Sequence, residues 1–363
     1  MNHNPIIPKG IYNLGNTCFL NACIQILLQT YELDLDLQAN SISEKLETKI
    51  YQEWKSLKQQ VIQSEHPVIS PNSFITMIHQ IAQQKNCLLF TGISQNDMPE
   101  FLLFFIENMH IFFKREVDYK INGMKQTQVD ALALQCYNMI VKRYEKDYSP
   151  LIDIFYGVMV SSIHSLGQNH SLGHSLGHSL GNPDSTIEGQ VLSSISEPYF
   201  IIDLPISGNN IYDCLDQYIS PELMENENAW FNEKTQQKEN VYKKISFWNF
   251  PKIIVFTFKR FLTEFSKEQG IQMSKKNDFI QFPLQDLDLS KYIRGYNPQK
   301  YKYDLYGICN HIGDISDGHY TAFVKNTQND WFHCNDHIIQ KVEHLEHMIT
   351  PMAYSLFYRL HKS

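Results

Sequence analysis

The sequence predicts an α+β fold in which a mainly helical part comes first and a β-rich part follows. Apolar residues at helical spacing dominate residues 18–148, among them the amphipathic stretch 43–63. From Phe155 onward, runs such as FYGVMVSSI, PYFIIDLPI, KIIVFTFKRF and YDLYGIC alternate or stay apolar over strand lengths, with turn formers between them. We therefore expect a helical lobe followed by a sheet lobe.

The composition is that of a globular chain with a large core. Of the 363 residues, 43% are hydrophobic, and 22 Phe and 20 Tyr are available for burial, enough for one large or two ordinary domains. The formal net charge of −8 argues against a dedicated nucleic-acid binder. It suits an acidic surface that meets a partner with a basic face.

We expect neither a signal peptide nor a membrane span. The first residues, MNHNPIIPKG, lack the charged-then-apolar order of a signal peptide, and the longest apolar stretch, FLLFFIENMHIFF, is interrupted by Glu107, Asn108 and His110. Seven cysteines without a CxxC pair do not form a disulfide framework. We therefore expect a soluble protein of a reducing compartment, the cytosol or the nucleus, with no membrane partner.

The stretch GIYNLGNTCFLNACIQ, residues 10–25, places Cys18 where a turn becomes a helix. The turn formers Gly15 and Asn16 precede it, and either Asn16 or Thr17 would cap the apolar helix that follows. A thiol in the first turn of a helix feels the positive end of the helix dipole, which favours the reactive thiolate. The alternative is a small core residue, because free cysteine is among the most buried residue types.

A thiolate enzyme also needs a base and a group that orients the base. GHYTAFV, residues 318–324, places His319 at the start of a strand-like run, and WFHCNDHII, residues 331–339, places Asn335 and Asp336 within a second one. The polar NTQND stretch between the runs predicts a hairpin turn, which would make His319 and Asn335 cross-strand neighbours. The alternative for any one of the 15 histidines is a satisfied structural residue.

Three blocks of the chain resemble, in order and spacing, the ubiquitin-specific protease family. GIYNLGNTCFLNACIQ is similar to its cysteine box, and YDLYGICNHIG followed by GHYTAFV and WFHCNDHII is similar to its histidine box. Between them, QNDMPEFLLFFIENM resembles the family's acidic segment, FPKIIVFTFKRF resembles its central palm strand, and EPYFIIDLPI also fits. The resemblance covers roughly the whole chain and implies a papain-like cysteine protease fold with a helical thumb, a β-sheet palm and β fingers.

The resemblance implies a single catalytic domain over residues 9–361. The thumb would span about residues 9–150, and the fingers and palm about residues 151–361. Cys18 would lie on the thumb and His319 on the palm, so the active site would be the cleft where the two lobes meet. Neither lobe could be catalytic alone.

Residue by residue, the resemblance implies a Cys-His-Asn triad. Cys18 would be the nucleophile, His319 the general base and Asn335 the group that orients His319; many members have Asp at the third place, and an amide adds less charge stabilisation. Asn13, five positions before the cysteine, matches the oxyanion residue of the family, and Asp336 would be a second supporter of the site. The alternative for Asn13 is a turn residue bonded locally.

The implied reaction is hydrolysis of the isopeptide or peptide bond after the C-terminal glycine of ubiquitin, through an acyl-enzyme thioester. The implied partners are ubiquitin and ubiquitinated proteins, and neither a cofactor nor a metal is required. We expect the chain to act as a monomer.

The basic tail of ubiquitin needs acidic partners, and Asp97 and Glu100 match the positions where the family supplies them. Both residues also suit the first turn of a helix, which is the alternative. Gln95 belongs to the same segment. A diglycine end implies a narrow channel for the ubiquitin tail, and Tyr320 and Phe261 are expected to line this tail channel.

A low-complexity segment, residues 163–185, contains HSLG four times. Histidines four apart on a helix would bind zinc, but each glycine disfavours a helix by ~1 kcal/mol relative to alanine, so a flexible loop at the fingertips is the better interpretation. The fingertip zinc of the family uses two CxxC pairs, which would fall at Ser165 and Gln168 and within residues 231–240, and neither place has cysteines. We predict no structural zinc in its usual form.

Three function classes follow from these patterns. They are an active deubiquitinating cysteine protease, a catalytically weak ubiquitin-binding scaffold of the same fold, and a metal-binding protein built on the HSLG array. The protease is favoured because the cysteine, the histidine and the oxyanion asparagine are all present.

Overall fold

The computed structural model describes residues 5–35, 46–92, 94–166, 189–266, 270–314 and 317–361. The expected loop at residues 163–185 therefore lies mostly outside the described residues. Described strands flank it, β3 (Gly157–Ser165) before it and β4 (Val191–Tyr199) after it.

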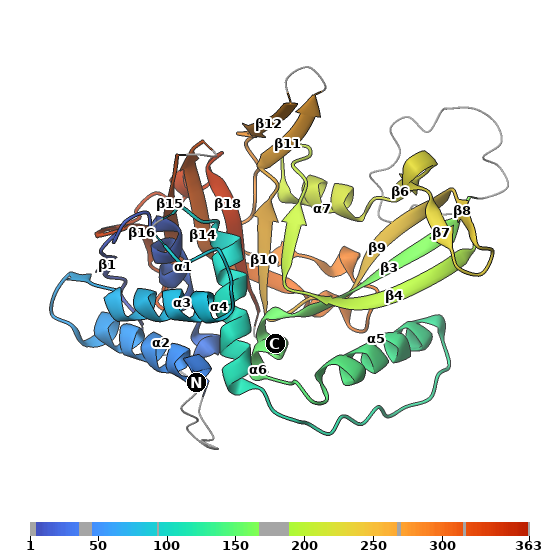
Figure 1. The fold of residues 1–363 in the computed structure, drawn as a ribbon, viewed down its shortest axis with the longest axis horizontal. Helices are drawn as coiled ribbons and strands as arrows, with labels where there is room; N and C mark the ends of the chain where they lie inside the picture. The colour runs from blue at the N-terminus through green and yellow to red at the C-terminus, as the bar shows by residue number, and fades with distance from the viewer. Residues whose placement is uncertain are drawn as a thin grey trace.

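The first part of the chain is helical, as predicted. Its helices are α1 (Cys18–Leu28), α2 (Leu46–Gln63), α3 (Asn72–Gln84), α4 (Met98–Phe113), α5 (Gln128–Tyr144) and α6 (Pro150–Phe155), with a 3-10 turn η1 (Tyr31–Leu33) after α1. Helices α1 to α4 gather on one side of the molecule (Figure 1). In α2 the apolar residues Ile50, Trp54, Leu57 and Val61 recur at helical spacing and are all buried, which fixes the face that packs inward.

Helix α5 packs elsewhere. It begins with a capping box between Thr127 and Asp130 and lies beneath β4 in Figure 1. Its residues Ala133 and Cys136 form a small core with Trp248 and with β3. The helix therefore supports the second sheet of the molecule.

The main sheet is almost entirely antiparallel. Its order is β17 (Ile338–Lys341), β16 (Trp331–Asn335), β15 (Gly318–Lys325), β14 (Lys302–Gly313), β18 (Ala353–Leu360), β10 (Ile253–Phe258) and β5 (Ile201–Leu204), with β13 (Leu287–Asp288) also paired to β14. Only β10 and β5 run parallel among these pairs. The predicted hairpin exists: β15 and β16 are antiparallel neighbours joined by residues 326–330.

Both faces of this sheet are covered. Helix α1 packs on one face so closely that a Cβ at Gly307 of β14 would lie 2.8 Å from a methyl carbon of Ile26. The other face carries a second core, to which α7 (Ile211–Ile219) contributes Cys214 and Leu215. Burial of α1 between the other helices and the sheet fixes its direction, and with it the position of Cys18.

A second, four-stranded sheet extends to the right in Figure 1, in the order β4, β3, β9 (Val241–Asn249) and β6 (Glu222–Met224). Small pairs complete the fold: β1 (Gly10–Ile11) with β2 (Val68–Ile69), β7 (Trp230–Asn232) with β8 (Gln237–Glu239), and β11 (Phe261–Ser266) with β12 (Gly270–Lys275). Further 3-10 turns are η3 (Asn226–Asn228), η4 (Ser290–Tyr292), η5 (Pro298–Lys300) and η6 (Leu345–Met348). The α+β prediction is thus confirmed.

The far end of the second sheet is closed by hydrogen bonds. Hairpin β7–β8 covers the segment in which the second CxxC pair of the family would fall. There Asn232 Nδ2 and Thr235 Oγ1 both donate to Glu239 Oε1, at 2.9 and 2.6 Å. This network fixes the turn between β7 and β8.

None of the helices in the described part of the chain is both long and apolar enough to cross a bilayer.

Candidate active site

A strained turn places Cys18 at the start of α1. Gly15 and Asn16 both have positive φ, 103° and 54°, conformations that glycine and asparagine tolerate best. Thr17 stands at the N-cap position, but its hydroxyl accepts from Leu14 N at 3.0 Å and caps no helical N–H. A side-chain cap by Thr17 is therefore wrong, because the tight turn engages the threonine first. Cys18 is only 4% exposed.

His319 lies between the thiol and an amide. Its Nε2 is 2.8 Å from Asn335 Oδ1, and because that oxygen can only accept, Nε2 carries a proton and Nδ1 is left for Cys18. A hydrogen bond to Cys18 raises the pKa of His319 to about 9, against the opposing effect of burial and with a smaller contribution from Asn335. The predicted neighbours on β15 and β16 are thus in contact.

Asp336 connects the sheet to the turn before α1. It follows β16 with a φ of 48°, and its carboxylate accepts from Asn13 Nδ2 at 2.9 Å and from Asn21 Nδ2 at 2.7 Å. The Oδ1 atom of Asn13 accepts from the backbone N–H groups of Gly15 and Thr17, both at 3.1 Å. Asn13 is therefore bonded locally through its oxygen, while Asp336, at the end of β16, fixes the orientation of its amide nitrogen.

Asn21 was not recognised from the sequence. It lies one turn after Cys18 on α1 and is 2% exposed. A buried asparagine within the apolar run CFLNACIQ was the available signal, because a buried amide needs a partner. Its partner is Asp336, more than three hundred residues away.

Asp97 holds α4 against the sheet. It is the N-cap residue of α4 and accepts from Glu100 N at 3.3 Å, while the hydroxyls of Tyr354 and Tyr320 donate to its Oδ2 at 2.7 and 3.2 Å. Burial raises the pKa of Asp97, and these hydrogen bonds oppose the rise. Most of its acceptor capacity is therefore used within the protein.

The other expected tail-channel residues divide into bonded and open ones. Gln95 Oε1 accepts from Gly318 N at 3.2 Å, one residue before His319. Tyr320 is 7% exposed, and Phe261 packs its ring 5.4 Å from that of Tyr354. The exposed carboxylate is that of Glu100, whose pKa is raised by partial burial and by Asp97 beside it.

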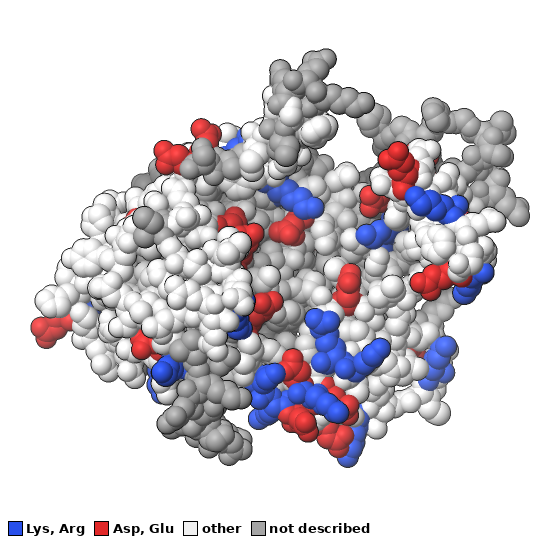
Figure 2. Space-filling view, viewed as in Figure 1, with Lys and Arg blue, Asp and Glu red and all other residues white. Residues whose placement is uncertain are grey.

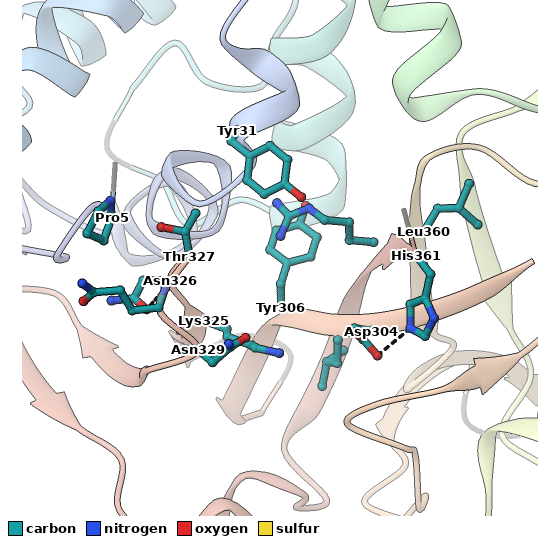
Figure 3. Close-up of a pocket in the computed structure, with 13 residues that line it drawn as sticks. Pro5, Tyr31, Asp304, Tyr306, Lys325, Asn326, Thr327, Asn329, Leu360 and His361 are labelled. Atoms are coloured by element: carbon teal, nitrogen blue, oxygen red, sulfur yellow. Dashed lines mark hydrogen bonds and ion pairs between the residues drawn. The ribbon is translucent and has the colours of Figure 1, made fainter. Parts of the chain in front are cut away.

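A cavity lies at the other end of α1, and none of the expected site residues lines it. Figure 3 shows this cavity of about 430 Å³, with Tyr31 and Tyr306 in its wall and Asp304 bonded to His361 at 2.8 Å. The guanidinium of Arg359 lies 3.9 Å from the centre of the Tyr31 ring and 4.2 Å from that of Tyr306. This cavity is therefore separate from the candidate site at the Cys18 end.

Charge on the face of Figure 2 is mixed. Lysine and arginine alternate with acidic residues on the lower part of this view, and no continuous basic stripe crosses it. Such a stripe would be the mark of a nucleic-acid-binding face.

Comparisons with known proteins all point to the same family. The family model described as ubiquitin carboxyl-terminal hydrolase matches residues 9–358. Ubiquitin carboxyl-terminal hydrolase 2 of Bos taurus is 28% identical over 367 residues, which cover 97% of this chain and 55% of the relative. A probable ubiquitin carboxyl-terminal hydrolase, R319, of Acanthamoeba polyphaga mimivirus is 26% identical over 96% of this chain and 89% of its own length.

A solved structure gives the same result for the fold. The SAGA deubiquitinase module Ubp8/Sgf11/Sus1/Sgf73 bound to monoubiquitin contains a chain with a TM-score of 0.69 and 20% identity, over 99% of this chain and 72% of that one. The predicted papain-like α+β fold is confirmed by this likeness. The chain spans about 55% of the length of the curated relatives with the strongest matches. Because the family model covers nearly all of it, the chain belongs to the ubiquitin carboxyl-terminal hydrolase family.

Proposed function

We propose that the chain is a deubiquitinating cysteine protease that hydrolyses the isopeptide or peptide bond after the C-terminal glycine of ubiquitin. The observation that carries the proposal is the position of His319, between Asn335 on one ring nitrogen and Cys18 on the other. The names of the relatives supply the substrate class, and two of the solved neighbours are complexes that contain monoubiquitin or ubiquitin aldehyde.

The first half of the reaction transfers the acyl group to sulfur. The Cys18 thiolate attacks the glycine carbonyl carbon, and the carbonyl oxygen becomes an oxyanion. Asn13 Nδ2 and the backbone N–H of Cys18, which as a first-turn N–H has no partner within its helix, would donate to that oxyanion. His319 then gives its proton to the departing amine as the C–N bond breaks, which leaves a thioester.

The second half restores the enzyme. His319, now neutral, takes a proton from water, and the hydroxide attacks the thioester carbonyl. The C–S bond breaks, the ubiquitin carboxylic acid leaves and gives its proton to solvent, and the proton on His319 again faces the thiolate. The raised pKa of His319 keeps its imidazole protonated at neutral pH, so that it can give a proton to the departing amine.

Two features support a narrow, glycine-ended substrate. Cys18 is almost fully buried, so a carbonyl can reach it only on a thin chain end. Glu100 offers an open carboxylate close to Asp97, suited to the basic residues that precede the two glycines.

The test is a covalent one. Purified protein is mixed with ubiquitin carrying a C-terminal electrophile, and intact mass is measured. We expect a single adduct that Cys18→Ala abolishes and Cys87→Ala leaves unchanged, since Cys87 is the partly exposed free cysteine among the described residues. An adduct that survives Cys18→Ala, or none at all, would falsify the proposal. Ubiquitin binding without an adduct would instead favour the catalytically weak scaffold.

A further inference from the structure

Hairpin β11–β12 stands beside the candidate site and projects from the main sheet at the top of Figure 1. Two of its large apolar side chains, Phe265 and Met273, are 76% and 58% exposed. Its last residue, Lys275, turns back toward the sheet.

The ammonium of Lys275 donates all three of its protons within the protein. Its Nζ donates to His311 Nδ1 at 2.9 Å, to His311 O at 2.9 Å and to Gly313 O at 2.7 Å, and an ammonium has three protons to give. Burial and the nearby Arg260 lower the pKa of Lys275, while Asp314 opposes this. A half-buried lysine with three ordered acceptors is a fixed part of the structure.

These acceptors flank the catalytic strand. In the β14–β15 ladder His311 is opposite Tyr320, Ile312 is opposite His319, and Gly313 is opposite Gly318. Lys275 therefore binds the residues on both sides of the cross-strand partner of His319.

His311 transmits the contact to the backbone next to His319. An ammonium only donates, so Nδ1 of His311 must accept and the imidazole is neutral. Burial, and then Lys275, lower its pKa to about 4. A Cβ on Gly318 would lie 2.1 Å from His311 Nε2, so the ring lies directly against the residue before His319.

Resting on the proposed function, we propose that Lys275 is a positioning residue that locks hairpin β11–β12 to the end of the β14–β15 ladder and, through His311, sets the position of His319 relative to Cys18. The hairpin has a separate anchor. Arg260 donates through Nε to Ala353 O at 2.7 Å and through a terminal nitrogen to Lys276 O and Asp278 O, both at 3.0 Å. Loss of Lys275 should therefore loosen the site without unfolding the hairpin.

The test compares Lys275→Met with Lys276→Met, in a Cys87→Ala background. Methionine keeps the apolar stem and removes the donors, and Lys276 is the exposed neighbour. We expect Lys275→Met to slow labelling of Cys18 by the ubiquitin electrophile about 10- to 100-fold, the range expected when a catalytic group is misplaced by about 1 Å. Lys276→Met should label at the parent rate, and both variants should melt within a few degrees of it.

A second measurement needs no ubiquitin. The rate of Cys18 alkylation by iodoacetamide against pH reports the Cys18–His319 pair directly. We expect the midpoint to move up by about one pH unit in Lys275→Met, because a displaced imidazolium stabilises the thiolate less. Parent-like labelling and an unmoved pH profile in Lys275→Met would overturn the inference, as would equal losses in Lys276→Met. Absence of a ubiquitin adduct in the parent would overturn the proposed function instead, while the alkylation profile would still test the lock.

Discussion

The two ends of α1 both join the helical part of the molecule to the main sheet, but they do so with different chemistry. At the first end, Cys18 meets His319, and the Asn13 amide meets the carboxylate of Asp336. At the last end, Arg359 of β18 donates to Glu32 through two nitrogens, at 2.8 and 3.2 Å, and to Gln29 O at 2.7 Å.

The two ends differ in how many of their hydrogen-bonding groups already have partners within the protein. At the last end these groups bind one another: Arg359 lies between two tyrosine rings, and the hydroxyls of Tyr306 and Thr30 are 2.9 Å apart. At the first end, Asn13 Nδ2 has a second N–H beyond the one given to Asp336, and the N–H of Cys18 has no partner within its helix. We propose that both donate to a substrate. One junction therefore stabilises the fold, and the other keeps bonding capacity for chemistry, so substitutions should separate the two.

The largest effect is expected at Cys18. Cys18→Ala should lower kcat/KM for a ubiquitin C-terminal amide by about 10⁴-fold or more, as loss of a nucleophile does in other triad enzymes. The thermal midpoint should fall only modestly, because the substitution removes one small buried sulfur and its hydrogen bond to His319. If Cys18→Ala lowered the thermal midpoint severely as well as kcat/KM, the first end would also stabilise the fold, and the contrast between the two ends would be lost.

Arg359→Met should show the opposite pattern. It removes a largely buried ion pair, whose side chains are 17% and 16% exposed, together with two cation–π contacts. We expect a loss of about 2–4 kcal/mol in the free energy of unfolding, measured by urea denaturation, and little change in kcat/KM well below the midpoint. Lys341→Met, which breaks an exposed pair with Asp330, is the control and should change stability by less than about 1 kcal/mol.

Asp336→Ala should affect activity again, though less than Cys18→Ala. Without the carboxylate, Asn13 Nδ2 loses the acceptor that aims it, and we expect a fall in kcat of about 10²-fold, the size of effect seen when an oxyanion donor is removed. Asp330→Ala, in the turn at the other end of β16, is the control. Equal kcat values for the two variants would mean that Asp336 does not act on the oxyanion donor.

The candidate catalytic residues that lie in short motifs could be predicted from the sequence. The contacts between residues far apart in the chain could not. Cys18, His319 and Asn335 lie in motifs whose local pattern predicts a helix start and a hairpin. The pair Asn21–Asp336 depends on how the helical part docks on the sheet, and the pair Lys275–His311 depends on how hairpin β11–β12 folds against β14. No local spacing encodes either contact. Asp97 shows the same limit, because its helix-capping role could be predicted, whereas its bonds to Tyr320 and Tyr354 could not.

The smallest effect is the one that Asn335→Ala should have on the pKa of His319. Its hydrogen bond raises the pKa of His319 less than the bond to Cys18 does, so Asn335→Ala should lower that pKa modestly and Cys18→Ala should lower it more. Proton NMR of the imidazole checks the order, with the parent titrating at about 9. A raised folded-state pKa means that the stability contributed by His319 is complete below its unfolded pKa of about 6.5 and is lost as pH rises through about 9. The alkaline loss of stability should therefore shrink from the parent to Asn335→Ala and further to Cys18→Ala, and the reverse order would show that the amide, and not the thiol, dominates the site.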